Sequence, residues 1–138
     1  MCRATSTLAT TALVIATIVA AGCGSESAPE CPAGPPIAAD DRGLTARGTP
    51  VGLSLVANDV ACGGASLAIG SLDLDPATAG AQQWLTTDAG GFLLDCTGDV
   101  WFSPMPDFRG DAALTYTITD SEGQVSAPAR VVVTVGAD

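Results

Sequence analysis

The last third of the chain alternates regularly between apolar and polar side chains. Two runs place an apolar residue at every second position, and a turn at 120–123 separates them: Leu114, Tyr116 and Ile118 in the first run, and Val131, Val133 and Val135 in the second. Alternation with a period of two sends every second side chain to the same face of a strand. The pattern predicts an antiparallel hairpin with one buried face.

Shorter apolar or alternating segments precede this hairpin, at 37–39, 49–56, 67–74, 83–85, 91–95 and 99–102. Glycine, asparagine and aspartate separate them, as is typical of turns, and the turn at 95–98 ends in Gly98. A shift of the apolar phase near Gly70 predicts a β-bulge. About seven short strands in about 100 residues, without an amphipathic helix, predict an all-β fold: a single Ig-like, Greek-key antiparallel β-sandwich.

The N-terminal segment has the composition of an export signal. An uncharged apolar stretch at 8–19 follows Arg3 and is shorter than the roughly 20 residues that span a bilayer. Small residues come next, which predicts a secretory signal peptide over residues 1–22. Residues 23–36 are rich in Gly, Ser, Ala and Pro, so we expect a flexible tether there and the folded domain over residues 37–136.

Cys23 directly follows Ala20, Ala21 and Gly22. This tetrapeptide resembles the lipobox of bacterial lipoproteins, a family in which the cysteine thiol receives a diacylglyceryl group and the leader is cleaved before it. The resemblance implies lipidation at Cys23, with the mature protein anchored to a membrane of the cell envelope or at the cell surface. Ordinary secretory cleavage at the same place is the alternative.

The charge of the chain limits its partners and its chemistry. Five arginines and 15 acidic residues give a formal net charge of −10, and histidine is absent. Because like charges repel, we expect neither nucleic acid nor anionic lipid headgroups as partners. Without histidine, lysine or a nucleophile motif, most general-base and nucleophilic routes are closed, so we expect no enzyme. A glycosidase that uses a pair such as Asp73 and Asp75 is a remote alternative.

The cysteines predict a disulfide. Cys2 leaves with the signal peptide, and an exported protein sits where disulfides persist. Cys62 and Cys96 both fall in predicted turns of the globular part, so a Cys62–Cys96 bond is the preferred pairing, and Cys31 is the other candidate partner. If Cys23 carries a lipid, one of the three remaining cysteines stays free or pairs between chains.

Two kinds of ligand-binding residue are candidates. Acidic residues in or beside predicted loops could supply the oxygen ligands that calcium prefers: Asp40, Asp41, Asp59 and Asp120. The alternative is that these carboxylates cap turns through local hydrogen bonds. Trp84, Trp101 and Phe108 could stack on sugar rings if exposed. Core packing is the alternative and is preferred for Phe108, whereas in its strand either Trp101 or its two neighbours point outward. Trp84 lies in the least regular part of the chain and is the best candidate for an exposed ring. No cofactor other than calcium is expected.

Several motifs resemble those of bacterial surface proteins. Segments 48–51 and 56–60 resemble Ig-like and cadherin-like surface repeats. Others resemble the CshA-type fibril repeat of adhesins: Ser-Leu-Asp-Leu-Asp-Pro at 71–76, Val-Trp-Phe-Ser-Pro at 100–104, Phe-Arg-Gly at 108–110, Tyr-Thr-Ile-Thr-Asp at 116–120 and Gly-Gln-Val-Ser at 123–126. The resemblance implies a β-sandwich that serves as a stalk or adhesive module. It also implies a hydrogen bond from Tyr116 to the loop around Phe108, as in the tyrosine corner of Ig-like domains.

These features favour an exported, lipid-anchored cell-envelope protein with a structural or adhesive role. Its membrane contact would be the N-terminal lipid, and its partner another surface protein or a polysaccharide. The alternative is a small carbohydrate- or calcium-binding accessory module of a larger envelope complex. In both cases we expect the binding residues in the irregular stretches 58–64 and 75–88.

Overall fold

A computed structural model describes residues 31–136, so the predicted leader, Cys23 and the first part of the predicted tether lie outside the described residues. The described part contains eight strands and one short 3-10 helix: β1 (Asp41–Ala46), β2 (Val51–Ser54), η1 (Leu55–Ala57), β3 (Leu67–Asp73), β4 (Trp84–Thr87), β5 (Gly90–Leu94), β6 (Asp99–Pro104), β7 (Gly110–Asp120) and β8 (Ala129–Gly136). Within residues 31–136, no helix has the length and apolar character needed to cross a membrane.

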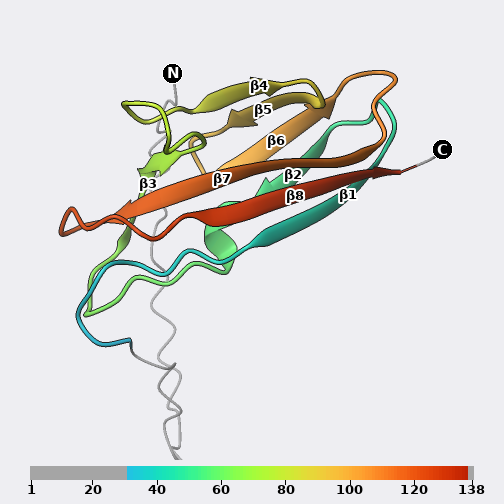
Figure 1. The fold of residues 1–138 in the computed structure, drawn as a ribbon. Helices are drawn as coiled ribbons and strands as arrows, with labels where there is room; N and C mark the ends of the chain where they lie inside the picture. The colour runs from blue at the N-terminus through green and yellow to red at the C-terminus, as the bar shows by residue number, and fades with distance from the viewer. Residues whose placement is uncertain (1–30, 137–138) are drawn as a thin grey trace, which may run out of the picture.

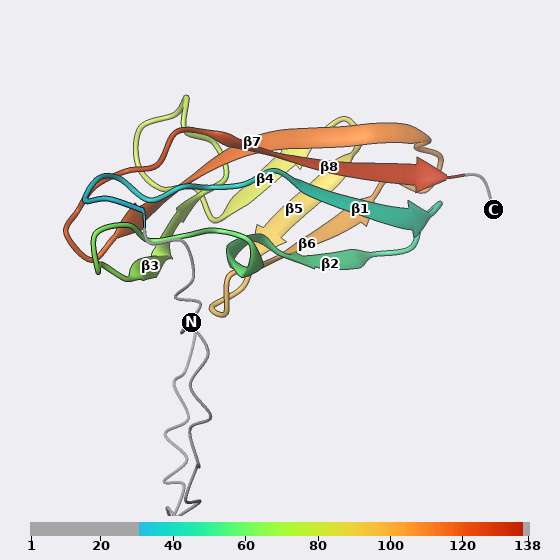
Figure 2. The ribbon, with the colours of Figure 1, turned by 90° about the horizontal axis from the view of Figure 1, so that it is seen from below.

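The strands form two four-stranded sheets, with the orders β1-β8-β7-β3 and β2-β6-β5-β4. The two sheets lie against each other as layers of a sandwich (Figures 1 and 2). The expected all-β, Ig-like architecture is therefore confirmed, with one strand more than the sequence pattern predicts.

The core lies between the sheets and follows the predicted alternation. In the β7–β8 hairpin, Leu114 lies opposite Val131 and Ala112 lies opposite Val133, and all four side chains are buried. In the other sheet, the rings of Phe92 and Phe102 pack with their centroids 4.5 Å apart. Burying large apolar side chains on both inner faces supplies the main driving force for the fold.

The first strand differs from the prediction. Ile37 forms only an isolated bridge with Val60, and the first strand is β1, which pairs with β8 in parallel rather than antiparallel fashion. The positions of β1 that face inward are Asp41, Gly43 and Thr45. Since none of them is a large apolar residue, the strand has no hydrophobic alternation that could be recognised in the sequence.

The bulge predicted near Gly70 is confirmed. Between the pairs Ala68–Thr119 and Asp73–Thr117, the register of β3 against β7 shifts, because β3 contains more residues than its partner over this stretch. Ser71 fills the gap in the ladder: its Oγ accepts a hydrogen bond from the Thr119 N–H at 2.8 Å and donates one to the Ala68 carbonyl at 2.6 Å. A side chain here replaces the missing backbone partner.

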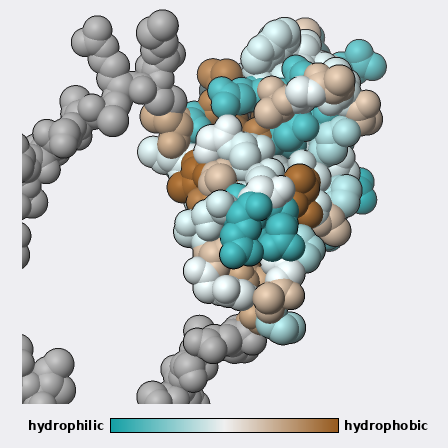
Figure 3. Space-filling model, turned by 90° about the vertical axis from the view of Figure 1, so that its left-hand side faces the viewer, coloured by the Kyte–Doolittle hydropathy of each residue, from teal (hydrophilic) through white to brown (hydrophobic). Residues whose placement is uncertain are grey.

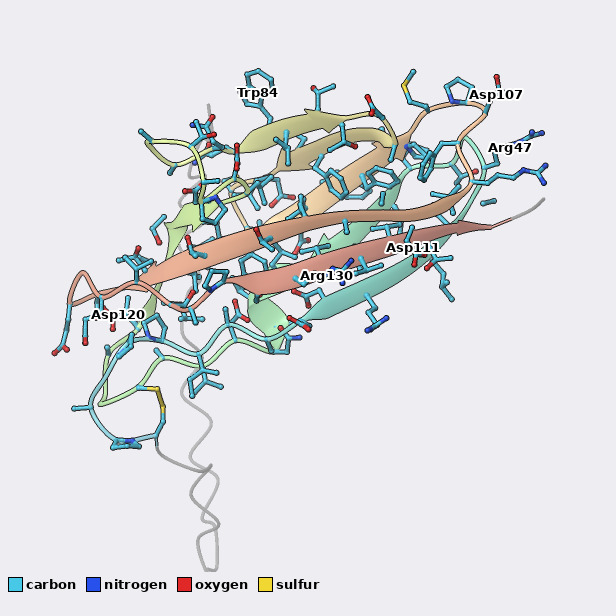
Figure 4. The ribbon with its side chains drawn as sticks, viewed as in Figure 1. Arg47, Trp84, Asp107, Asp111, Asp120 and Arg130 are labelled. Carbon is cyan, nitrogen blue, oxygen red and sulfur yellow. A yellow bond between two sulfur atoms is a disulfide. The ribbon has the colours of Figure 1, made fainter. Side chains whose placement is uncertain are left out.

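The disulfide joins Cys31 to Cys62, so the preferred Cys62–Cys96 pairing is wrong. Cys96 is an exposed free thiol on the turn between β5 and β6. In Figure 4 the disulfide is the yellow bond near the start of the described chain. It holds the N-terminal segment against the loop that follows η1, where the Gly63 N–H also donates a hydrogen bond to the Cys31 carbonyl at 3.2 Å.

Residues 31–36, which the composition places in the tether, lie in contact with the domain. Besides the disulfide, Gln124 Nε2 donates a hydrogen bond to the Gly34 carbonyl at 3.4 Å, and Pro36 is buried. The domain therefore includes residues before Ile37. A segment rich in Gly and Pro has little to bury, but here the disulfide and the packing offset the conformational entropy that it loses on folding.

Candidate functional site

Three large apolar side chains lie in one row across the outer face of the sheet β2-β6-β5-β4. Trp84 of β4 pairs with Leu93 of β5, and Leu93 pairs with Trp101 of β6. Directly paired residues point to the same side of a sheet. Their exposed fractions are 65%, 57% and 47%. We call these three residues the tryptophan row; Figure 4 shows Trp84 pointing away from the sandwich.

The ring of Trp101 lies across the neighbouring strand β2. Its register partner there is Gly52, and a Cβ at that position would meet three atoms of the indole six-membered ring, each at 3.2 Å. Equal distances to three ring atoms mean that the ring faces the backbone rather than standing on its edge. The absence of a side chain at Gly52 therefore lets the indole lie along the sheet with its other face toward solvent.

Asp95 holds the indole from the adjacent turn. Trp101 Nε1 donates a hydrogen bond to Asp95 Oδ2 at 3.3 Å. Asp95 Oδ1 accepts hydrogen bonds from Thr97 Oγ1 at 2.6 Å, from Thr97 N at 2.8 Å and from Asp99 N at 3.2 Å. These bonds, led by the one from the Thr97 hydroxyl, lower the pKa of Asp95. The carboxylate is therefore ionised at neutral pH and fixes the position of the ring.

A groove runs beside the tryptophan row and mixes apolar with polar groups. Its lining includes Trp84 and Leu93 from the row, Ile69 from β3, and the polar residues Gln83 and Asp95. The next row of the same sheet face consists of Thr86, Gly91 and Ser103, which are paired in register and small. The tryptophan row is therefore narrow, and on this side its large side chains project beyond the small ones of the next row.

The hairpin that carries this face depends on Gly90. Gly90 has a φ of +150°, and a Cβ there would collide with the backbone oxygen of Ser103 on the neighbouring strand. Thr87 closes the turn, since its hydroxyl donates to the Gly90 carbonyl at 3.0 Å and accepts from the Ala89 N–H at 3.2 Å. Only glycine allows this close approach of β5 to β6.

A second cluster surrounds the buried hydroxyl of Tyr116. This hydroxyl lies 2.8 Å from Asp59 Oδ1, 3.0 Å from the Ala39 carbonyl and 3.3 Å from the Leu55 carbonyl. The expected bond to the loop around Phe108 is thus wrong: the tyrosine ties together segments from the N-terminal part of the domain. Its side chain is fully buried, and burial together with Asp59 raises the pKa of the phenol.

The cluster also contains the carboxylates of Asp41 and Asp59, and only one oxygen of each has a hydrogen-bond partner. Asn58 Nδ2 donates to Asp41 Oδ1 at 3.1 Å, and the Ala39 N–H donates to Asp59 Oδ1 at 2.8 Å. The Oδ2 atoms of Asp41 and Asp59 are both buried without a hydrogen-bond partner in the structure. Burial raises the pKa of both groups, that of Asp41 to about 6, because desolvation disfavours the charged form.

Comparison with known protein families agrees with the fold. The sequence matches the bacterial Ig domain family over residues 33–134. The chain belongs to the bacterial Ig domain family. A search of the curated proteins finds no significant match. Domains of this family are non-catalytic structural modules, typical of surface and envelope proteins. The Cys31–Cys62 disulfide agrees with an extracytoplasmic location, where such bonds persist.

The four aspartates considered for calcium do not form one site in this Ig domain. Asp120 caps the turn after β7, where its Oδ1 accepts from the N–H groups of Glu122 and Gln124, both at 2.9 Å. Asp40 Oδ1 accepts from the Arg130 N–H at 2.9 Å. Among residues 31–136, no group of three or more acidic, cysteine or histidine side chains is arranged to hold a metal ion. Asp120 therefore fits the alternative in which the carboxylate caps a turn through local hydrogen bonds.

Of the sequence candidates, Trp84 is exposed as expected, and its role in binding stays a prediction. The sequence does not single out Leu93 as its companion, and it leaves the orientation of Trp101 open. Val100 and Phe102 are buried, so the alternation of β6 sends Trp101 outward. The signal was therefore in the sequence, but joining Trp101 to Trp84 requires the register of three strands, which no local pattern contains.

Proposed function

We propose that this chain is an exported, lipid-anchored envelope protein whose Ig domain binds another component of the cell surface through the tryptophan row. The leader-like segment 1–22 and the lipobox-like sequence ending at Cys23 support export and anchoring. The likeness of the C-terminal motifs to adhesin fibril repeats supports an adhesive role.

The observation that carries the proposal is the tryptophan row itself. Elsewhere, at the end of the sandwich with the β7–β8 turn, hydrophobic residues lie in separate small patches beside hydrophilic ones (Figure 3). Isolated exposed apolar residues are normal on protein surfaces, whereas contiguous ones mark interaction sites. Trp84, Leu93 and Trp101 are contiguous in register, and tryptophan is among the residues most enriched at binding hot spots.

Adhesion of cells that display the full-length chain tests this function. The double variant Trp84→Ala/Trp101→Ala should reduce attachment to other cells or to surfaces coated with cell envelope by about tenfold or more, since truncating a central aromatic anchor typically costs over ~1 kcal/mol. Leu44→Ala is the matched control, because Leu44 is 79% exposed on β1 of the opposite sheet. Equal attachment of the double variant and the wild type would refute the proposal.

A further inference from the structure

We propose that the tryptophan row is a platform for an extended, uncharged glycan chain that runs across β4, β5 and β6. This inference rests on the proposed function and names the chemical class of its ligand. The ligand would be a polymer of pyranose sugars joined through equatorial bonds, so that successive rings present flat C–H faces to one side.

The spacing of the two indoles matches such a polymer. Trp84 projects from β4, whereas the Trp101 ring lies over Gly52 of β2, three strand spacings away, which amount to about 14–15 Å. This is comparable to three sugar units of an extended, equatorially linked chain. One sugar would stack on each indole, and the units between them would pass over Leu93. Aromatic faces offer a large contact area at low entropic cost, because each has only two side-chain torsions.

Polar groups at the edge of the tryptophan row can form hydrogen bonds with the hydroxyl groups at the edge of a sugar ring. Asp95 Oδ1 already accepts three hydrogen bonds, whereas Oδ2 accepts only the one from Trp101. An ionised carboxylate has about four acceptor positions, so Oδ2 keeps one for a sugar hydroxyl. Gln83 lines the same groove and is exposed. An apolar floor with a few placed polar groups is the usual composition of a ligand site.

The site is organised before any ligand arrives. Gly52 leaves room for the Trp101 ring to lie along the sheet, and Asp95 fixes the ring by a hydrogen bond. A ring already held in its binding orientation loses little freedom when the ligand binds, which favours affinity. Gly52 is in this sense a positioning residue for the platform.

Size and charge favour this occupant over a protein. A stable protein interface buries about 800 Å² per partner, more than three partly exposed side chains can contribute, and the neighbouring row of Thr86, Gly91 and Ser103 offers only small side chains. Two copies of a chain with a net charge of −10 also repel each other. The same charge, with Asp95 at the row, disfavours acidic polysaccharides, so the ligand is a neutral one.

Titration calorimetry of the mature protein with neutral β-1,4-linked glucose and N-acetylglucosamine oligomers tests the inference. Binding should appear or strengthen sharply once the oligomer is long enough to reach both indoles, at about four units. Trp84→Ala and Trp101→Ala should each weaken it at least about tenfold, by loss of the stacking face. Gly52→Val keeps both tryptophans but lifts the Trp101 ring, and it should also weaken binding. Leu44→Ala should leave it unchanged, and thermal melting checks that every variant is folded.

The outcomes separate this inference from the proposed function. If none of the neutral oligomers binds while the double tryptophan variant still abolishes cell attachment, the glycan is the wrong ligand and the adhesive function stands. If the oligomers bind but attachment does not depend on the row, the glycan platform stands and the adhesive function fails. Equal binding of a polyuronate, binding that survives both tryptophan variants, or a dimer through this face would overturn the inference.

Discussion

At the scale of single residues, the least satisfied groups of the domain are Asp41 and Asp59. Both surround the Tyr116 hydroxyl, and each has one buried carboxylate oxygen without a hydrogen-bond partner in the structure. Burying a charged oxygen without a partner costs free energy, and protonation removes that cost. The cluster therefore links the stability of the fold to pH.

Asp41→Asn should stabilise the domain at neutral and alkaline pH. The pKa of Asp41 is raised from 3.8 to about 6. Burial is the main cause, the nearby charges of Asp59 and Asp40 act in the same direction, and hydrogen bonds from Tyr116 and Asn58 oppose the rise. A raised native pKa means that the folded state binds the proton more tightly than the unfolded state. The free energy of unfolding should therefore fall as the pH rises from about 4 to about 6.

Melting temperatures between pH 4 and pH 8 test this linkage. Asparagine keeps a carbonyl oxygen to accept from Asn58 Nδ2 but carries no charge. The variant should melt above the wild type at pH 8, and the difference should vanish near pH 4. Some pH dependence should remain, because burial also raises the pKa of Asp59. A variant that melts below the wild type at pH 8 would contradict the argument.

At the scale of elements, the strands that could be predicted are those with apolar alternation. The β7–β8 hairpin and the turn at 95–98 follow directly from side-chain pattern and turn chemistry. β1 could not be recognised, because its inward positions are Asp41, Gly43 and Thr45 and its only large apolar residue, Leu44, faces solvent. Its parallel pairing with β8 depends on a contact between segments that lie 90 residues apart in the sequence, as Asp41 and Val131 do.

The candidate site was predictable only in part for the same reason. Trp84 can be chosen from the sequence because it lies in the least regular segment, but the row exists only when β4, β5 and β6 are in register. The predicted pairing of the disulfide is wrong for a different reason. Cys31 lies in a Gly- and Pro-rich stretch that resembles a tether, and the closeness of Cys31 and Cys62, with Cα atoms 5.0 Å apart, arises from the tertiary fold.

The disulfide should contribute strongly to the stability of the domain. It joins residues 31 positions apart, and closing a loop of this length stabilises a fold by about 3–4 kcal/mol in the chain-entropy description. Cys31→Ser should lower the free energy of unfolding in urea by about this amount. Cys96→Ser is the matched control and should change little, because Cys96 is exposed and unpaired. A loss of stability in the control instead would show that the pairing is wrong.

At the scale of the whole molecule, the domain and the proposed lipid anchor should behave as separate parts. The net charge of −10 opposes adsorption to anionic lipid headgroups, so the membrane attachment that we propose would come from a lipid on the chain. A single acyl chain binds a membrane only marginally, whereas two or more anchor it stably. An N-terminal cysteine with a diacylglyceryl group meets that requirement, and residues 24–30 separate it from Cys31 and the disulfide.

Mass and thiol measurements on the mature protein test this division. We expect a mass that corresponds to a diacylglyceryl group on residues 23–138, and one thiol, that of Cys96, after denaturation without a reductant. Cys23→Ser should move the protein from the detergent phase to the aqueous phase while its melting temperature stays the same, because the core residues and both cysteines of the disulfide lie further along the chain. Two reactive thiols and an unmodified mass would mean that ordinary secretory cleavage releases the domain. A lower melting temperature of Cys23→Ser would mean that the anchor also supports the fold.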